Sequence, residues 1–187
     1  MREKLKSPED LYEWMENNLS YGYFGKDHKI HKEEDIDFEE SWNKNYQLQT
    51  PSEVIKNKVG TCWDYVELER DFFKTWKIKH YTIYHQVALP YENPYPTHSF
   101  LIFKKKEKWY WFEFAWEDEK GIKEYHSIQE LLKEESKKNI ELLKSYGLTK
   151  EEQEKIIYRV FQKPKEHMNA EQYISDALLS DSLDTIL

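Results

Sequence analysis

The chain has little of what marks secreted, membrane-spanning or nucleic-acid-binding proteins. Its 187 residues include a single cysteine, Cys62, so no internal disulfide can form and we expect a reducing, cytoplasmic setting. No apolar run approaches the ~18–20 residues of a membrane span, and residues 1–10 lack the apolar segment of a signal peptide. Acidic residues (36) outnumber basic ones (28), for a formal charge of −8. We therefore expect neither a membrane nor a nucleic acid as a partner.

Glycine and proline are also scarce, at five and six residues. No Gly/Ser linker and no internal repeat divides the sequence, so we expect one domain over residues 1–187. Aromatic residues are abundant: seven Trp, nine Phe and fourteen Tyr. Much of the core should therefore be aromatic.

The stretch from Val59 to Tyr65 (VGTCWDY) is the most informative part of the sequence. The segment that follows it, as far as Trp76, repeats apolar residues with the period of an amphipathic helix. Thr61 is a good N-cap and Asp64 falls at the third helical position, which predicts a capping box. Cys62 then lies in the first helical turn, where free backbone N–H groups and the helix dipole favour a thiolate over a thiol.

Capping signals and apolar patterns predict the other elements. Helices should begin after Ser7, Thr50, Ser127, Thr149 (leading into Ile156 and Ile157) and Asn169. Strands are expected at 79–89, 98–103, 109–116 and 158–161, with a proline-rich loop at 90–97. Residues 22–50 are weakly patterned, and the pair His28 and His31 within them fits a solvated loop better than half of a metal site.

A histidine and a glutamate are spaced so that they can meet across two strands. If 98–103 and 109–116 form an antiparallel hairpin whose turn is centred on Lys105-Lys106, His98 lies directly opposite Glu113. A carboxylate beside an imidazole orients the ring and stabilises its protonated form. Glu113 is also the charged residue of an otherwise apolar strand face, where a buried charge needs a partner. An odd turn or a bulge would break this pairing.

Each of the three residues has an alternative interpretation. Cys62 alone fits a small buried apolar residue, His98 a surface histidine at a loop end, and Glu113 a strand residue that faces solvent. Taken jointly they predict a triad in which Cys62 is the nucleophile, His98 the base and then the acid, and Glu113 the orienting group. The oxyanion hole would combine the backbone N–H of Cys62 with a second donor. The candidates for that donor are Trp42, Gln47 and Gln49.

These segments resemble the transglutaminase-like superfamily. The matching residues are Gly60-Thr61-Cys62-Trp63-Asp64 at a helix start, His98-Ser99-Phe100 opening a strand, and Glu113-Phe114 on the next strand. The intervals of 36 residues from Cys62 to His98 and 15 from His98 to Glu113 are usual for that family, and the resemblance covers about residues 45–120. The family usually has aspartate where this chain has Glu113, and the extra methylene changes the geometry.

The resemblance implies an α+β fold with a papain/transglutaminase-like core at about 45–120. The cysteine-bearing helix would pack on an antiparallel β-sheet, with helical flanks at 1–44 and 121–187. It also implies hydrolysis or acyl transfer at an amide of a peptide or protein through a thioester, without a cofactor or a metal. The substrate, the acceptor (water or an amine) and the oligomeric state stay open.

Two further functions are compatible with the sequence. The chain could be a catalytically silent module that binds a peptide or protein partner in an aromatic cleft, or a structural domain without a site. Trp109, Trp111 and Trp116 could line such a cleft, although packing is favoured for at least two of them. His80 and His85 are five residues apart on one strand, so we expect them on opposite faces as ordinary half-buried histidines.

Overall fold

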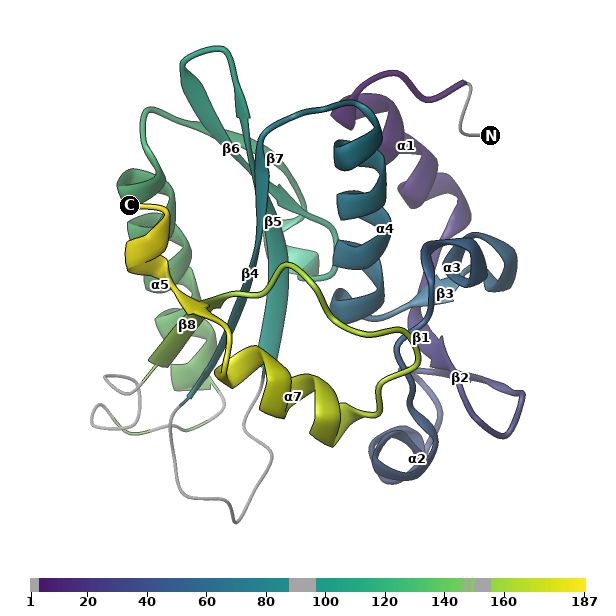
Figure 1. Ribbon diagram of the computed structural model, residues 1–187. Coiled ribbons are helices and arrows are strands. Elements are labelled where there is room, and N and C mark those ends of the chain that lie inside the picture. Colours follow the sequence, from purple (N-terminus) through teal and green to yellow (C-terminus); the bar gives the residue numbers. More distant parts are fainter. Residues whose placement is uncertain (1–3, 88–96, 146, 148, 150–155) are drawn as a thin grey trace.

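The computed structural model describes residues 4–87, 97–145, 147, 149 and 156–187 (Figure 1). Its helices are α1 (Pro8–Asn18), α2 (Phe38–Asn45), α3 (Pro51–Asn57), α4 (Cys62–Thr75), α5 (Ile128–Ser145) and α7 (Ala170–Leu178), with short 3₁₀ helices η1 (Glu117–Glu119) and η2 (Leu183–Thr185). Its strands are β1 (Ser20–Phe24), β2 (Ile30–Lys32), β3 (Val59–Gly60), β4 (His80–Val87), β5 (Thr97–Lys105), β6 (Lys108–Glu113), β7 (Gly121–Tyr125), β8 (Ile156–Val160) and β9 (Asp181–Ser182).

A six-stranded antiparallel sheet organises the fold, with strand order β7-β6-β5-β4-β8-β9. Helices α4 and α1 cover one face of this sheet, and α5 covers the other (Figure 1). Phe72 of α4 packs with Phe103 and Phe112 on the first face. Trp111 packs with Leu131 of α5 on the second face. Helices cover both faces of the sheet, which explains why β5 and β6 are apolar on both sides. The combination of these helices with an antiparallel sheet confirms the predicted α+β fold.

Local capping explains where the helices begin. Ser7, Thr50 and Asn169 each form a capping box at the start of α1, α3 and α7, and proline fills the first turn of α1 and α3. The predicted strands correspond to β4, β5, β6 and β8. Most of the predicted loop at 90–97 and of the helix after Thr149 lies outside the described residues. Ile156 and Ile157, which that helix was expected to reach, instead begin β8.

The prediction of a solvated loop around His28 and His31 is wrong. This region contains β1, β2 and α2, and His31 is buried on β2. The Nε2 atom of His31 lies 3.0 Å from a carboxylate oxygen of Asp27, and its Nδ1 atom lies 3.1 Å from Oγ of Ser41. The flanks predicted to be helical thus also contain strands: β1 and β2 before the core, and β7, β8 and β9 after it.

A small second sheet, β2-β1-β3, connects the N-terminal part of the chain to the cysteine. Strand β1 runs parallel to β3, with Ser20 beside Val59 and Tyr21 beside Gly60. A Cβ atom at Gly60 would lie 2.8 Å from a ring carbon of Tyr65, so only glycine allows this close approach. Tyr21 therefore pairs with the residue that lies two positions before Cys62 in the chain.

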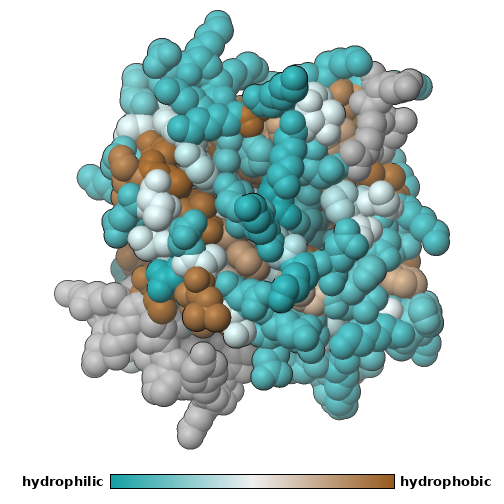
Figure 2. Space-filling model, in the orientation of Figure 1, coloured by the Kyte–Doolittle hydropathy of each residue, from teal (hydrophilic) through white to brown (hydrophobic). Residues whose placement is uncertain are grey.

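Hydrophilic side chains cover most of the face shown in Figure 2, and hydrophobic ones gather on the side where the C-terminus lies. Leu179 and Leu187, near that end of the chain, are 83% and 54% exposed. Within the described ranges, no helix combines the length and apolar character that crossing a membrane would require.

Candidate active site

Cys62 is the first residue of α4 and is held there by the carboxylate of Asp64. Oδ2 of Asp64 accepts hydrogen bonds from the backbone N–H of Thr61 at 2.9 Å and from its hydroxyl at 3.0 Å. Oδ1 accepts from the backbone N–H of Gln49 at 2.8 Å. These bonds fix the chain on both sides of Cys62, whose own backbone N–H belongs to the first turn and has no acceptor within the helix. The cysteine is 7% exposed.

Burial raises the pKa of Asp64 to about 6, although the hydrogen bonds from Thr61 and Gln49 act in the opposite direction. Since the folded-state pKa lies above the ordinary value of 3.8, ionising this carboxyl costs more in the folded chain than in the unfolded chain. The contribution of Asp64 to stability is therefore greatest at low pH and falls as the pH rises from about 4 to about 6.

Comparing the wild type with Asp64→Asn tests this account. The free energy of unfolding of the wild type, relative to that of the variant, should fall by up to about 3 kcal/mol between pH 4 and pH 7, since each unit of pKa corresponds to about 1.4 kcal/mol. Urea denaturation at several pH values measures the difference. Parallel stability curves for the two proteins would contradict it.

His98 and Glu113 are brought together by β5 and β6. Nε2 of His98 lies 2.8 Å from Oε2 of Glu113. Because Nε2 is engaged with Glu113, Nδ1 is the ring nitrogen left for Cys62, whose thiol is close enough to raise the pKa of His98. The structure thus places the three predicted residues next to one another.

The carboxylate of Glu113 is 1% exposed and accepts hydrogen bonds from four donors. Besides His98, the indole N–H of Trp111 donates to Oε2 at 3.3 Å. The backbone N–H groups of Ala115 and Trp116 both donate to Oε1 at 2.9 Å. A buried carboxylate with this many donors has a fixed orientation.

The hairpin register differs from the predicted one by two residues. Lys105 pairs with Lys108 and Leu101 with Phe112, so the two-residue turn is Lys106-Glu107 rather than Lys105-Lys106. Extending this register by one step places Glu113 beside Phe100, and His98 is then a diagonal neighbour of Glu113 on the same face. Diagonal neighbours are about 7–8 Å apart at Cα, a distance that long side chains bridge. The extra methylene of glutamate, compared with aspartate, supplies that reach.

The charge of Glu113 favours the protonated form of His98. Burial alone would lower the pKa of His98, but the carboxylate of Glu113 and the interaction with Cys62 outweigh it, and the pKa is raised well above its ordinary value of 6.5. An imidazolium beside a thiol favours the thiolate. This is the electrostatic arrangement that a cysteine nucleophile requires.

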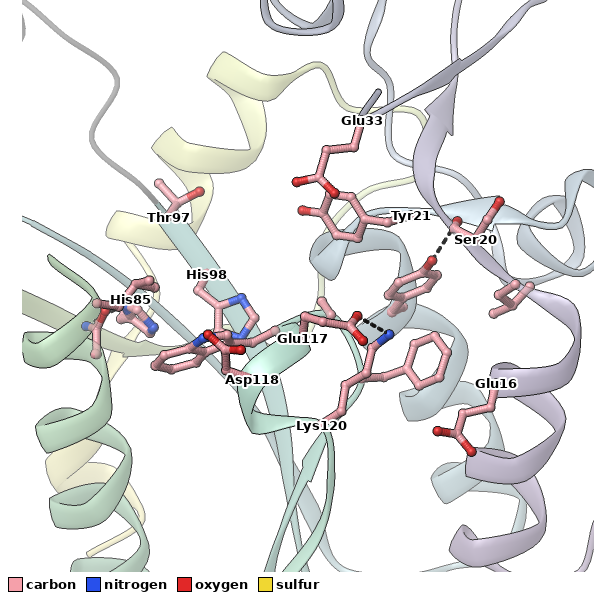
Figure 3. Close-up of a pocket in the computed structure, with 17 residues that line it drawn as sticks. Glu16, Ser20, Tyr21, Glu33, His85, Thr97, His98, Glu117, Asp118 and Lys120 are labelled. Carbon is pink, nitrogen blue, oxygen red and sulfur yellow. Dashed lines mark hydrogen bonds and ion pairs between the residues drawn. The ribbon is translucent and has the colours of Figure 1, made fainter. Parts of the chain in front are cut away.

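His98 also faces a cleft of about 740 Å³ (Figure 3). The cleft is lined by residues of the N-terminal segment 16–33, by Tyr65 of α4, by β4 and β5, by the segment that follows β6 and by α5. The residues around it are Glu16, Leu19, Ser20, Tyr21, Glu33, Tyr65, His85, Thr97, His98, Phe114, Ala115, Trp116, Glu117, Asp118, Lys120, Asn139 and Leu142. Trp116 therefore lines the cleft, whereas Trp109 and Trp111 pack in the core under α5, as expected for two of the three.

The described residues that line the cleft do not include Trp42, Gln47 or Gln49, the predicted oxyanion donors. Trp42 stacks on Tyr46, with ring centroids 3.8 Å apart. The side-chain amide of Gln49 donates to the carbonyl of Val59 at 3.0 Å and accepts from Asn57 at 2.8 Å. The side chains of Trp42 and Gln49 are thus engaged in contacts within the protein rather than directed into the cleft.

His85 lies beside His98, although the sequence did not predict that it belongs to the site. It is 3% exposed, pairs with His98 across β4 and β5, and its ring centroid is 5.6 Å from that of His98. Its Nε2 atom lies 3.2 Å from Oε1 of Glu135 on α5, and its Nδ1 atom lies 3.2 Å from Asn139. The prediction of an ordinary half-buried histidine is wrong, because α5 closes over this part of the sheet.

In the part of the chain that the structure describes, no group of three or more histidine, cysteine or acidic side chains has the geometry of a metal site.

A cysteine at a helix N-terminus, facing a histidine–carboxylate pair on an antiparallel sheet, defines the papain-like class of folds. A family model described as a transglutaminase-like domain matches residues 2–141, a range that includes Cys62, His98 and Glu113. The chain belongs to the transglutaminase-like family, which confirms the resemblance found in its sequence. No curated protein matches the chain.

Proposed function

We propose that the protein is a cysteine hydrolase or acyltransferase that acts on an amide bond of a peptide or protein through a thioester. The observation that carries the proposal is the buried carboxylate of Glu113, which holds His98 at 2.8 Å. Burying a carboxylate is costly, and a chain that needed only a stable sheet would gain more from an apolar residue there. The cost is understandable if Glu113 orients His98 toward Cys62.

The proposed reaction uses these groups in turn. Cys62 transfers its thiol proton to Nδ1 of His98, and the thiolate attacks the amide carbonyl carbon. The backbone N–H of Cys62 stabilises the resulting oxyanion. His98 then donates its proton to the departing nitrogen, which leaves an acyl thioester on Cys62. Finally, His98 deprotonates water or an amine, which attacks the thioester and releases the acyl group together with the regenerated thiol.

Alkylation of Cys62 tests the proposal at the level of the nucleophile. At pH 6, where a free thiol is almost entirely protonated, iodoacetamide should modify the native protein at least about tenfold faster than N-acetylcysteine. The raised pKa of His98 keeps the imidazolium present at this pH and above, so His98→Ala should lower the rate to that of the free thiol. Because Cys62 is the sole cysteine, mass spectrometry reports one site.

His80→Ala is the matched control for this measurement. His80 lies on the same strand as His85 but bonds to the carbonyl of Ile78 and lies outside the cleft lining, so the alkylation rate should not change. Slow labelling that is indifferent to His98→Ala would contradict the proposal and favour a catalytically silent binding module. A panel of peptides and amines, scored against Cys62→Ser, then separates hydrolysis from acyl transfer.

A further inference from the structure

The cleft extends to both sides of His98 (Figure 3). On one side lie His85 and Thr97, and Asn139 of α5 lies 3.2 Å from Nδ1 of His85. On the other side lie Glu16 of α1, and Ser20, Tyr21 and Glu33. The turn that follows β6 runs between the two sides and contributes Glu117, Asp118 and Lys120. A ligand in the cleft would therefore pass His98 and reach two chemically different walls.

Negative charge dominates the lining. Four carboxylates face one ammonium group, and that ammonium, on Lys120, is 2.5 Å from Oε2 of Glu117. Among the described residues, no ion pair joins Glu16, Glu33 or Asp118 to a basic side chain. With histidine counted as neutral, the lining has a formal charge of −3. A concave surface with one sign of charge concentrates ligands of the opposite sign.

The other wall is polar but carries no formal charge of its own. His85 lines the cleft and is 3% exposed. Its Nε2 atom lies 3.2 Å from Oε1 of Glu135, which is not among the described residues that line the cleft, and its Nδ1 atom lies 3.2 Å from Asn139. Both ring nitrogens of His85 are therefore engaged within the protein, and the charge complement for a basic ligand lies on the acidic side of the cleft.

We propose that this cleft selects a peptide segment that carries lysine or arginine side chains. The basic side chains lie against Glu16, Glu33 and Asp118, the lining carboxylates that no described basic side chain neutralises. This inference rests on the proposed function, because the cleft reaches the proposed triad at His98 and the inference names the class of substrate that would bind there. It also opposes acidic peptides, whose carboxylates would meet unpaired charges of the same sign.

Binding to the full-length Cys62→Ala protein tests the inference apart from catalysis. Isothermal titration calorimetry would compare acetyl-(Ala-Lys)₄-amide with the corresponding Ala-Gln and Ala-Glu peptides. The lysine peptide should bind at least about tenfold more tightly than the glutamine peptide, and added salt should reduce that ratio because it screens exposed charges. The glutamate peptide should bind most weakly.

A pair of double variants with equal net charge identifies the groups responsible. Glu16→Gln/Glu33→Gln should weaken binding of the lysine peptide about three- to tenfold, as expected for two exposed ion pairs. Glu13→Gln/Glu34→Gln changes exposed residues on the same segments that lie outside the cleft lining, and should leave binding unchanged.

The inference is overturned if the lysine and glutamine peptides bind equally, or if both double variants weaken binding to the same extent. These outcomes are independent of the alkylation test. Tight binding of the lysine peptide to a protein whose Cys62 is unreactive would support the cleft's selectivity while removing the proposed catalysis. Rapid alkylation without a preference for the lysine peptide would support the proposed catalysis and remove the selectivity of the cleft.

Discussion

Replacing Glu113 with glutamine should lower kcat about 10³–10⁴-fold. The amide can present only one oxygen. If that oxygen accepts from the backbone N–H groups of Ala115 and Trp116, the amide NH₂ faces Nε2 of His98. The imidazole must then accept at Nε2 and hold its proton on Nδ1, toward Cys62. A histidine with its proton on that nitrogen cannot take the thiol proton.

Steady-state kinetics on a peptide substrate would measure this loss. Glu124→Gln on the adjacent strand β7 is a suitable control, because Glu124 is exposed and bonds to Tyr110 rather than to His98; its kcat should match that of the wild type. The near-ultraviolet circular dichroism of Glu113→Gln should stay native. A folded Glu113→Gln variant with wild-type kcat would remove the orienting role assigned to the carboxylate.

Glu113→Asp should lower kcat about 10²-fold, even though aspartate is the usual residue of the family. The observed register makes His98 and Glu113 diagonal rather than direct neighbours. A carboxylate that is one methylene shorter cannot reach both His98 and the backbone N–H groups of Ala115 and Trp116. A displacement of about 1 Å in a positioning group is enough for a loss of this size.

The pH dependence of kcat separates a positioning defect from loss of the fold. In Glu113→Asp the charge is retained, so a weakened contact should shift the pKa of His98 down toward its ordinary value and move the corresponding limb of the pH–rate profile with it. Glu113→Asp with undiminished kcat would show that the side chain at this position adapts to the register. The diagonal geometry would then have no bearing on catalysis.

Signals confined to a few neighbouring residues were predicted most reliably from the sequence. Ser7, Thr50 and Asn169 start helices because each caps backbone N–H groups within its own first turn. The same holds for Thr61 and Asp64, which fix Cys62 at the start of α4. These bonds depend little on the rest of the fold.

The hairpin illustrates a partial success. Two apolar strands with an even turn follow from the pattern, and so does the shared face of His98 and Glu113. The position of the turn does not follow, because no glycine or asparagine marks it and Lys106 takes the positive φ of 57° itself. A shift of two residues preserves the face, which is why the pair still meets.

Features that depend on distant segments could not be predicted. Strand β1 (SYGYF) has no alternating pattern of its own and forms because it pairs with β2 and β3. His85 meets Glu135 only because α5 packs across the sheet. The acidic wall requires α1 and the segment around Glu33 to converge beside η1. Nothing local in the sequence indicates that convergence.

The walls of the cleft and the proposed triad are encoded in different stretches of the chain. Cys62, His98 and Glu113 come from the central sheet and α4, whereas Glu16 and Glu33 precede them and Asn139 and Leu142 follow. Under the proposed function, substitutions in the outer stretches would change which peptides bind without altering the three residues of the proposed triad. Over evolutionary time the two properties can diverge separately. Under the proposed selectivity, we expect members of this family with the same three central residues to differ in peptide preference according to the charges at the positions equivalent to 16, 33 and 118.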